Sequence, residues 1–161
     1  MCPCVPLLIL VAGAAVAASL DPARVDTVVE SHVAALNEQG RANREEVEAV
    51  QTLVADLNGD GKAEIVLLST RYFGNASSSQ LTVFTDRGRG HVPVAQSSDA
   101  LGQVEKIEVK DGRVLVHALW LGPRDARCCP SVKRTATYAW QGNKLVASKS
   151  GGSKPPPPRS N

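Results

Sequence analysis

Aromatic residues and histidines are scarce in this sequence. Only 4% of its 161 residues are Phe, Trp or Tyr, and its three histidines, His32, His91 and His117, are far apart along the chain. The scarcity of rings argues against a carbohydrate-binding platform built on aromatic side chains. No Gly-x-Ser-x-Gly, His-Glu-x-x-His or phosphate-binding loop occurs, so no complete catalytic constellation is visible.

The sequence also lacks a charge imbalance and a hydrophobic run that could span a membrane. Its formal net charge is +2, and without a basic patch nucleic acid is not an expected partner. The apolar run from Val5 to Ala18 is shorter than the roughly 20 residues of a membrane-spanning helix. Because it ends in small residues, it predicts a secretory signal peptide over residues 1–19.

Cysteine is sparse in the predicted mature chain. Cys2 and Cys4 precede the apolar run, so cleavage of the signal peptide leaves Cys128 and Cys129. No cysteine stands at the cleavage point, where a lipoprotein carries the one that is lipidated. The sequence therefore predicts an exported protein without a stable membrane anchor, either periplasmic or secreted.

The remaining two cysteines are adjacent, and exported chains face oxidising conditions. They can form a vicinal disulfide, remain two thiols or form intermolecular bridges. Neighbouring alpha carbons lie about 3.8 Å apart, whereas disulfides prefer roughly 4.4–6.8 Å, so a vicinal bridge would impose a tight, rigid turn. Because no Cys-x-x-Cys accompanies a βαβ pattern, a structural bridge between Cys128 and Cys129 is favoured over thiol catalysis.

Two changes in composition mark the ends of the predicted folded body. Residues 20–147 form a stretch of normal size for one domain with its own core. Residues 148–161 contain Gly-Gly-Ser and four consecutive prolines and predict a disordered tail. We therefore expect a single domain between a leader and a tail.

The order of the predicted elements indicates an α+β fold. Asp21 and Pro22 suit the start of a helix, and apolar residues at spacings of three and four continue over residues 25–36. Short extended segments follow, with tight turns at residues 111–112 and 142–143. We expect an N-terminal amphipathic helix packed on an antiparallel sheet of about seven short strands.

Two polar stretches predict connections rather than strands. Residues 41–48 are charged and indicate a solvated connection, and residues 71–80 include a Gly-Asn pair and three consecutive serines, typical of a loop. The first three strands are therefore expected at residues 51–56, 64–70 and 81–85.

An acidic loop, Asp56-Leu57-Asn58-Gly59-Asp60-Gly61-Lys62-Ala63-Glu64, joins the first two predicted strands. Oxygen-bearing side chains stand at its positions 1, 3, 5 and 9, with glycine at position 6. Calcium is a hard cation that takes roughly six to eight oxygen ligands. The predicted ligands are the side chains of Asp56, Asn58, Asp60 and Glu64 and the backbone carbonyl of Lys62.

Two other structures are alternatives to this calcium loop. An EF-hand would place a bidentate Glu at about position 12, where this chain has Leu67, and helices rather than strands would flank it. A metal-free polar β-turn would also fit, because Asn-Gly and Asp-Gly favour hairpins. Calcium is preferred because three spaced oxygen ligands precede Gly61 and a carboxylate follows at Glu64.

The loop resembles the calcium loops of FG-GAP and VCBS-type β-repeats, whose pattern is Asp-x-Asn/Asp-x-Asp-Gly-x-x-Asp followed by a strand. Asp56, Asn58, Asp60 and Gly61 match this pattern, and Glu64 replaces the usual Asp. The resemblance implies one calcium site. The repeats that build a propeller are absent, so neither that fold nor adhesion is implied.

A second resemblance covers the last third of the predicted domain. The segments Asp125-Ala126-Arg127-Cys128-Cys129-Pro130-Ser131 and Thr137-Tyr138-Ala139-Trp140-Gln141-Gly142-Asn143-Lys144-Leu145 look like the C-terminal signature of the LppP/LprE lipoproteins and related exported bacterial proteins. The chain departs from these lipoproteins in lacking the anchoring cysteine. The resemblance implies bacterial export and a small β-rich domain, and it implies no known reaction.

These observations favour a non-catalytic exported domain that binds one structural calcium ion and acts as a partner-binding or envelope accessory protein. The alternative hypothesis is an envelope hydrolase or thiol-redox enzyme whose site assembles only in three dimensions. His32 lies on the apolar stripe of the predicted helix, where packing is a more common role than metal binding.

Overall fold

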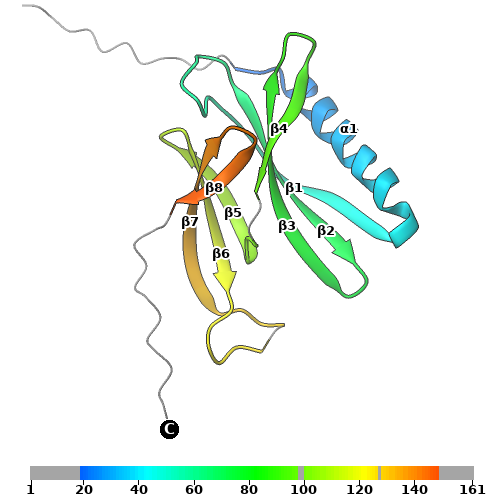
Figure 1. Ribbon diagram of the computed structural model, residues 1–161, viewed down its shortest axis with the longest axis vertical. Coiled ribbons are helices and arrows are strands. Elements are labelled where there is room, and N and C mark those ends of the chain that lie inside the picture. Colours follow the sequence, from blue (N-terminus) through cyan, green and yellow to red (C-terminus); the bar gives the residue numbers. More distant parts are fainter. Residues whose placement is uncertain (1–18, 98–99, 127, 149–161) are drawn as a thin grey trace, which may run out of the picture.

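The computed structural model describes residues 19–97, 100–126 and 128–148 (Figure 1). Within them, one α-helix and one short 3-10 helix precede eight β-strands. The elements are α1 (Pro22–Gly40), the 3-10 helix (Arg41–Asn43), β1 (Glu45–Ala55), β2 (Glu64–Phe73), β3 (Ala76–Asp86), β4 (His91–Ser97), β5 (Gln103–Lys110), β6 (Arg113–Trp120), β7 (Val132–Gln141) and β8 (Lys144–Ser148).

The predicted signal peptide and tail lie outside the described residues, apart from Ser19 and Ser148. In the part of the chain that is described, no helix is both long enough and apolar enough to cross a membrane.

All eight described strands belong to one sheet, which curls until its two end strands approach each other (Figure 1). Their order is β1-β2-β3-β4-β8-β7-β6-β5. Neighbours are antiparallel except for β4 and β8, which pair in parallel over two residue pairs. The predicted α+β fold with about seven antiparallel strands is therefore wrong, because the protein is mostly sheet and nearly closed like a barrel, with one helix.

The fold prediction failed because two polar segments form strands. β1 begins at Glu45, inside the stretch expected to be a solvated connection. Residues 71–80 are not a loop but the paired ends of β2 and β3 around a tight turn at Gly74 and Asn75. Pairing with a neighbouring strand outweighs the weak strand propensity of serine and glutamate. The longer strands allow the sheet to curl.

The two hairpins predicted from turn residues are confirmed. Asp111 and Gly112 connect β5 to β6, and both have positive φ, 51° and 67°, as a type I′ turn requires. Gly142 and Asn143 connect β7 to β8. These turns are local, so the sequence specifies them without tertiary information.

β2 is buried on both of its faces. Val66 and Leu68 point into the interior of the curled sheet, where they join the main core. Ile65 and Leu67 point to the outside of the sheet, where α1 covers them. The run of consecutive apolar residues in this strand thus reflects a strand enclosed between two layers.

α1 begins as the sequence predicts and lies on the outer face of the sheet (Figure 1). The carboxylate of Asp21 accepts a hydrogen bond from the backbone N–H of Ala23 at 3.1 Å. Val25 and Val29 pack against a small cluster that includes Phe84. His32 contacts the ring of Phe84 edge-on, and burial lowers the pKa of this histidine. His32 therefore has a packing role beneath the helix.

A glutamine side chain joins the two ends of the sheet. The amide of Gln51 in β1 donates to the carbonyl of Ile107 in β5 at 2.9 Å and accepts from the N–H of Ile107 at 2.8 Å. The side chain thus replaces the backbone ladder between these strands. A bulge at Val50 shifts the register of β1 next to this residue.

Candidate functional site

The acidic loop from Asp56 to Glu64 covers one end of the curled sheet. Leu57 is buried, 8% exposed, in the main core, so the loop folds back over the interior. The β5–β6 turn lies against it, since a Cβ atom added at Gly112 would stand 3.0 Å from the carbonyl oxygen of Leu57. The loop and this turn together close that end of the molecule.

The side chains of four predicted ligands accept hydrogen bonds from the backbone of the loop itself. Asp56 accepts from the N–H groups of Gly59 and Gly61, at 2.7 and 2.9 Å. Asn58 accepts from the N–H of Asp60 at 2.9 Å and donates to the carboxylate of Asp60 at 3.2 Å. The hydrogen bonds from Gly61 first, and then from Gly59, hold the pKa of Asp56 below its usual value. The loop therefore gathers these side chains in one tight turn.

Asp60 and Glu64 accept their backbone hydrogen bonds at opposite ends of the loop. Asp60 accepts from the backbone N–H of Lys62 at 2.8 Å. The side chain of Glu64 reaches back to the start of the loop, where it accepts the N–H of Leu57 at 2.9 Å. Glu64 is fully buried, and burial raises its pKa, with further contributions from the charges of Asp60 and Asp56. It is thus a buried carboxylate whose charge is opposed by those of Asp60 and Asp56.

The acidic loop meets some of the requirements of a cation site and not others. No three His, Cys, Asp or Glu side chains among the described residues are grouped as a metal site would require. The oxygens present are nevertheless of the carboxylate and amide type that calcium prefers. Each carboxylate oxygen has a second lone pair, so one that accepts a backbone N–H keeps capacity for a cation.

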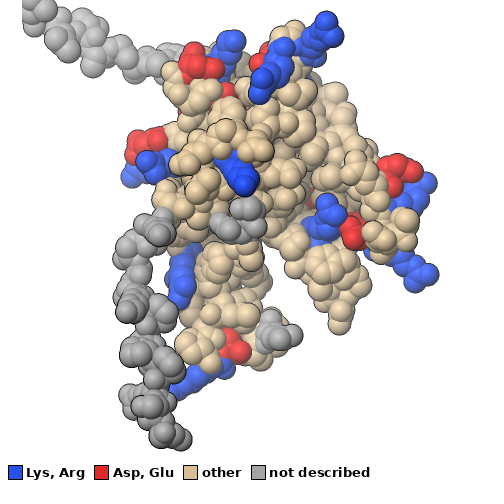
Figure 2. Space-filling view, in the orientation of Figure 1, with Lys and Arg blue, Asp and Glu red and all other residues tan. Residues whose placement is uncertain are grey.

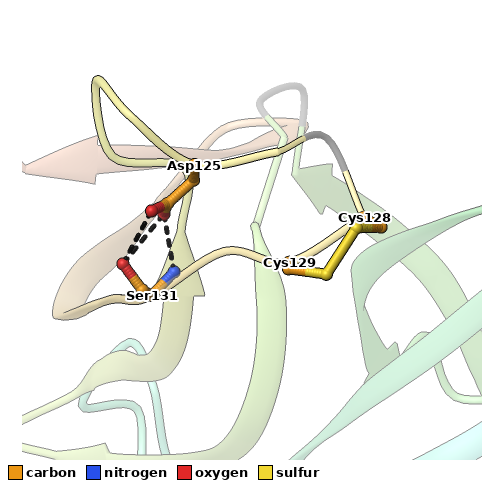
Figure 3. Close-up of a disulfide and its surroundings, with 4 residues drawn as sticks. All are labelled: Asp125, Cys128, Cys129 and Ser131. Atoms are coloured by element: carbon orange, nitrogen blue, oxygen red, sulfur yellow. Dashed lines mark hydrogen bonds between the residues drawn. A yellow bond between two sulfur atoms is a disulfide. The ribbon is translucent and has the colours of Figure 1, made fainter.

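The β6–β7 connection carries the two cysteines and is organised by Asp125 (Figure 3). Asp125 accepts the N–H of Gly122 and the N–H of Ser131, both at 2.8 Å, and the hydroxyl of Ser131 at 2.9 Å. The hydrogen bond from Gly122 is the main cause that holds the pKa of Asp125 below its usual value. In this loop a disulfide joins Cys128 to Cys129.

A cleft lies at the end of the sheet opposite the acidic loop, and we call it the mouth cleft. Its volume is about 750 Å³, within the size range of small-molecule sites. Figure 2 shows the hollow between the lobe formed by the β2–β3 end and the lobe formed by β6 and β7. The cleft is lined by Thr70, Ser77, Ser78, Ser79, Ala100, Leu101, Gly102, Gln103, Val104, Leu119, Trp120, Leu121, Cys128, Pro130 and Arg134.

The mouth cleft is not predictable from local sequence patterns. Its residues come from five separate segments, which only the curling of the sheet brings together. One signal was present, however, because Arg134 alternates with Ala136 and Tyr138 in β7 and so shares their inward face. A charged residue on the otherwise apolar face of a strand indicates either that the strand end is solvent-exposed or that a binding site lies there.

The hydrogen-bonded chain around His117 is separate from the mouth cleft. His117 lies 3.1 Å from a carboxylate oxygen of Glu108 and 3.0 Å from the hydroxyl of Thr135. It alternates with the inward-facing Val116 and Ala118, so it stands on the outer face of the sheet. None of these three residues lines the mouth cleft.

Comparison with family models connects this structure to known proteins. A model described as LppP/LprE lipoprotein matches residues 57–143, more than half of the chain. The chain belongs to the LppP/LprE lipoprotein family. The part of this LppP/LprE protein that matches starts within the acidic loop and ends at the β7–β8 turn, so it includes the mouth cleft and the cysteine pair. Neither the curated proteins nor the solved structures contained a match.

Membership of this family indicates that the protein is exported or associated with the envelope. The family model matches well beyond the two C-terminal segments from which the resemblance was recognised, and it reaches back to Leu57 in the acidic loop. The name of the family specifies no reaction. The candidate sites are the acidic loop and the mouth cleft at the two ends of the sheet.

Proposed function

We propose that this protein is a non-catalytic exported domain that binds one structural calcium ion in its acidic loop and serves as an accessory or partner-binding protein of the bacterial envelope. Glu64 carries the proposal. It is a fully buried carboxylate whose charge is opposed by burial and by Asp60 and Asp56. A divalent cation would attract all three carboxylates and offset two of their three negative charges.

The raised pKa of Glu64 makes a metal-free loop sensitive to pH. The folded pKa lies above the ordinary value of 4.5, so Glu64 favours the folded state below that value. This contribution is lost as the pH rises through the folded pKa. Above its folded pKa the ionised side chain therefore destabilises the fold, and calcium binding would offset that cost.

The proposed ion would act on the corner between β1 and β2. Asp56 stands directly after β1, and Glu64 is the first residue of β2. Leu57 between them is part of the main core. A cation held by both ends of the loop would fix the crossing of the two strands and the closure of this end of the sheet.

Calcium titration followed by thermal melting tests the proposal. At a calcium concentration 100-fold above Kd, binding to the folded state alone adds about 2.7 kcal/mol of stability, so the Tm of the wild type should rise by several degrees. Asp60→Ala should lose this response. Asp26→Ala, which removes an exposed acidic residue from α1, should keep it. An unchanged wild-type Tm would refute the calcium site.

The variant Glu64→Gln distinguishes the effect of the charge of Glu64 from the effect of its hydrogen bond to Leu57. The amide oxygen can still accept the N–H of Leu57, but it carries no charge. In the absence of calcium this variant should melt higher than the wild type at pH 7 and lose that advantage below pH 4.5, the ordinary pKa of Glu64. Its Tm should respond little to calcium. A full calcium response in this variant would exclude Glu64 as a ligand.

A further inference from the structure

The disulfide of the β6–β7 connection is open to solvent. It joins Cys128 to Cys129, and both of these residues are exposed. In Figure 3 the bridge lies apart from the hydrogen bonds between Asp125 and Ser131. Thiol–disulfide exchange requires that a thiolate reach one of the two sulfur atoms. The exposure of both cysteines meets this requirement.

The bridge links no two strands of the fold. Its cysteines are neighbours in the sequence and lie within one connection. A disulfide stabilises a protein mainly by closing a loop of the unfolded chain, and it stabilises more when the loop is longer. Neither cysteine belongs to the two clusters of buried residues that form the core. The bond can therefore break without separating any part of the sheet.

Hydrogen bonds hold both ends of the connection independently of the bridge. Asp125 accepts the N–H of Gly122, which precedes the cysteines, and the N–H of Ser131, which follows them. The backbone N–H of Asp125 also donates to the carbonyl of Gly122 at 3.2 Å. Between these anchors, the N–H of Cys129 donates to the carbonyl of Ala126 at 3.0 Å. Opening the bridge would thus change the segment between the anchors and leave its ends in place.

These features distinguish the bridge from the structural disulfides of exported proteins. Coupling between two equilibria is reciprocal, so a bridge that stabilises the fold is itself stabilised by folding. Structural bridges accordingly resist reduction, whereas exposed bridges are the labile and regulatory ones. Because the fold gains little from a bond between Cys128 and Cys129, folding opposes its reduction little.

We infer that Cys128 and Cys129 form a reversible redox site that exchanges two electrons with a dithiol, so that the protein responds to the thiol state of its surroundings. A thiolate of the dithiol attacks one sulfur of the bridge. The bond between the cysteines breaks, and the other cysteine leaves as a thiolate that takes up a proton. The second thiol of the reductant then attacks the mixed disulfide and releases the first cysteine. In total, two electrons and two protons pass to the cysteine pair, and the dithiol becomes a disulfide.

This redox site is independent of the proposed calcium site. The cysteine pair lies between β6 and β7, whereas the acidic loop joins β1 to β2. Exchange with a dithiol changes the state of the pair once for each reductant molecule, so it is compatible with a non-catalytic protein. Either site can fail its test without affecting the other, and the redox experiments are performed without calcium.

Alkylation followed by mass spectrometry tests the inference on the exported protein. Peptide mapping separates this pair from Cys2 and Cys4, which precede the predicted cleavage point. Freshly isolated protein should carry the bridge and take up no iodoacetamide at Cys128 or Cys129. Dithiothreitol without denaturant should make both cysteines react, and oxidised dithiothreitol should restore the bridge. Two alkylated cysteines in the fresh protein, or a bridge that opens only after denaturation, would overturn the inference.

Thermal melting separates a redox site from a stabilising bridge. The oxidised and the reduced wild type should have the same Tm, because the bridge closes no long loop. The double variant Cys128→Ser with Cys129→Ser is the control, which should melt at that temperature with and without dithiothreitol. A Tm that falls by several degrees when the wild type is reduced, but not when the control is treated, would show that the bridge is structural and refute the inference.

Amide chemical shifts locate the change that reduction produces. The N–H signal of Cys129 should move between the oxidised and the reduced protein, because its hydrogen bond to Ala126 lies between the anchors. The signals of Val116 and Tyr138, which are buried in the main core, should stay unchanged. Movement of these core signals to the same extent would show that the bridge supports the sheet, which contradicts the inference.

Discussion

Single polar side chains hold the irregular parts of this protein in place. Glu64 accepts a backbone N–H at the start of the acidic loop, and Gln51 pairs with both backbone groups of Ile107. Asp125 gathers the β6–β7 connection, which carries Cys128 and Cys129. In each case a side chain supplies the partner that regular secondary structure would otherwise provide.

Asp125→Ala should release the β6–β7 connection without unfolding the sheet. The backbone N–H groups of Gly122 and Ser131 lose their acceptor, so their amide hydrogens should exchange faster when followed by NMR. Arg124→Ala changes an exposed neighbour and should leave both exchange rates unchanged. Unaltered exchange at Gly122 in Asp125→Ala would show that Asp125 does not organise this loop.

The contribution of Asp125 should also depend on pH. Its folded pKa lies below the ordinary value of 3.8. The stability that it provides is therefore fully present above that value and lost as the pH falls through the folded pKa. The difference in Tm between the wild type and Asp125→Ala should accordingly be largest near neutral pH and shrink on acidification.

At the scale of elements, the closure of the sheet depends on contacts between β1 and β5 that are not a backbone ladder. β1 carries a bulge at Val50, which is 54% exposed. Beside it, Gln51 reaches across to Ile107. Farther along β1, the amide of Asn37 from α1 pairs with both backbone groups of Val47. The amide of Asn37 thus covers part of the edge of β1 and that of Gln51 part of the edge of β5, and these edges would otherwise be open to pairing with another chain.

Gln51→Ala should destabilise the protein by about 1–3 kcal/mol, because the N–H and carbonyl of Ile107 lose their partners in a partly buried position. Chemical denaturation measures this difference. Val50→Ala removes an exposed side chain next to it and should stay within about 0.5 kcal/mol of the wild type. Equal stability of the two variants would mean that the Gln51 amide does not close the sheet.

At the scale of the whole molecule, the curled sheet has two halves. One contains β1 to β4 with α1, and the other contains β5 to β8 (Figure 1). The halves meet along two seams. At one of them β4 and β8 pair over only two residue pairs. At the other, between β1 and β5, the side chain of Gln51 bonds to the backbone of Ile107. The main core spans both halves. The mouth cleft lies where the halves separate, so small movements between them would change its width.

Native-state hydrogen exchange should reveal this division. The amide of Ile107 at the seam should exchange through a partial opening of lower free energy than the amides of Val66 and Val83, which lie in the long paired strands β2 and β3. Exchange of Ile107 as slow as that of Val66 would show that the two halves open only by global unfolding.

The sequence predicts the local features of this protein. The helix start at Asp21, the turn at Asp111 and Gly112 and a strand over residues 64–70 all follow from residue type and spacing over a few positions. The acidic loop is also visible in the sequence. It is a local structure, because its side chains bond to backbone groups only two to seven residues away. Its occupation by calcium stays a prediction.

What the sequence could not determine depends on residues far apart. The polar segments at the ends of β2 and β3 become strands because they pair with each other, and pairing energy is invisible to local propensity. Gln51 and Ile107 are 56 residues apart, and Trp120 and Thr70 meet only across the mouth cleft. The sequence alone therefore determined the turns, the helix start and the acidic loop. Tertiary structure decided that the sheet curls and that it leaves a cleft at one end.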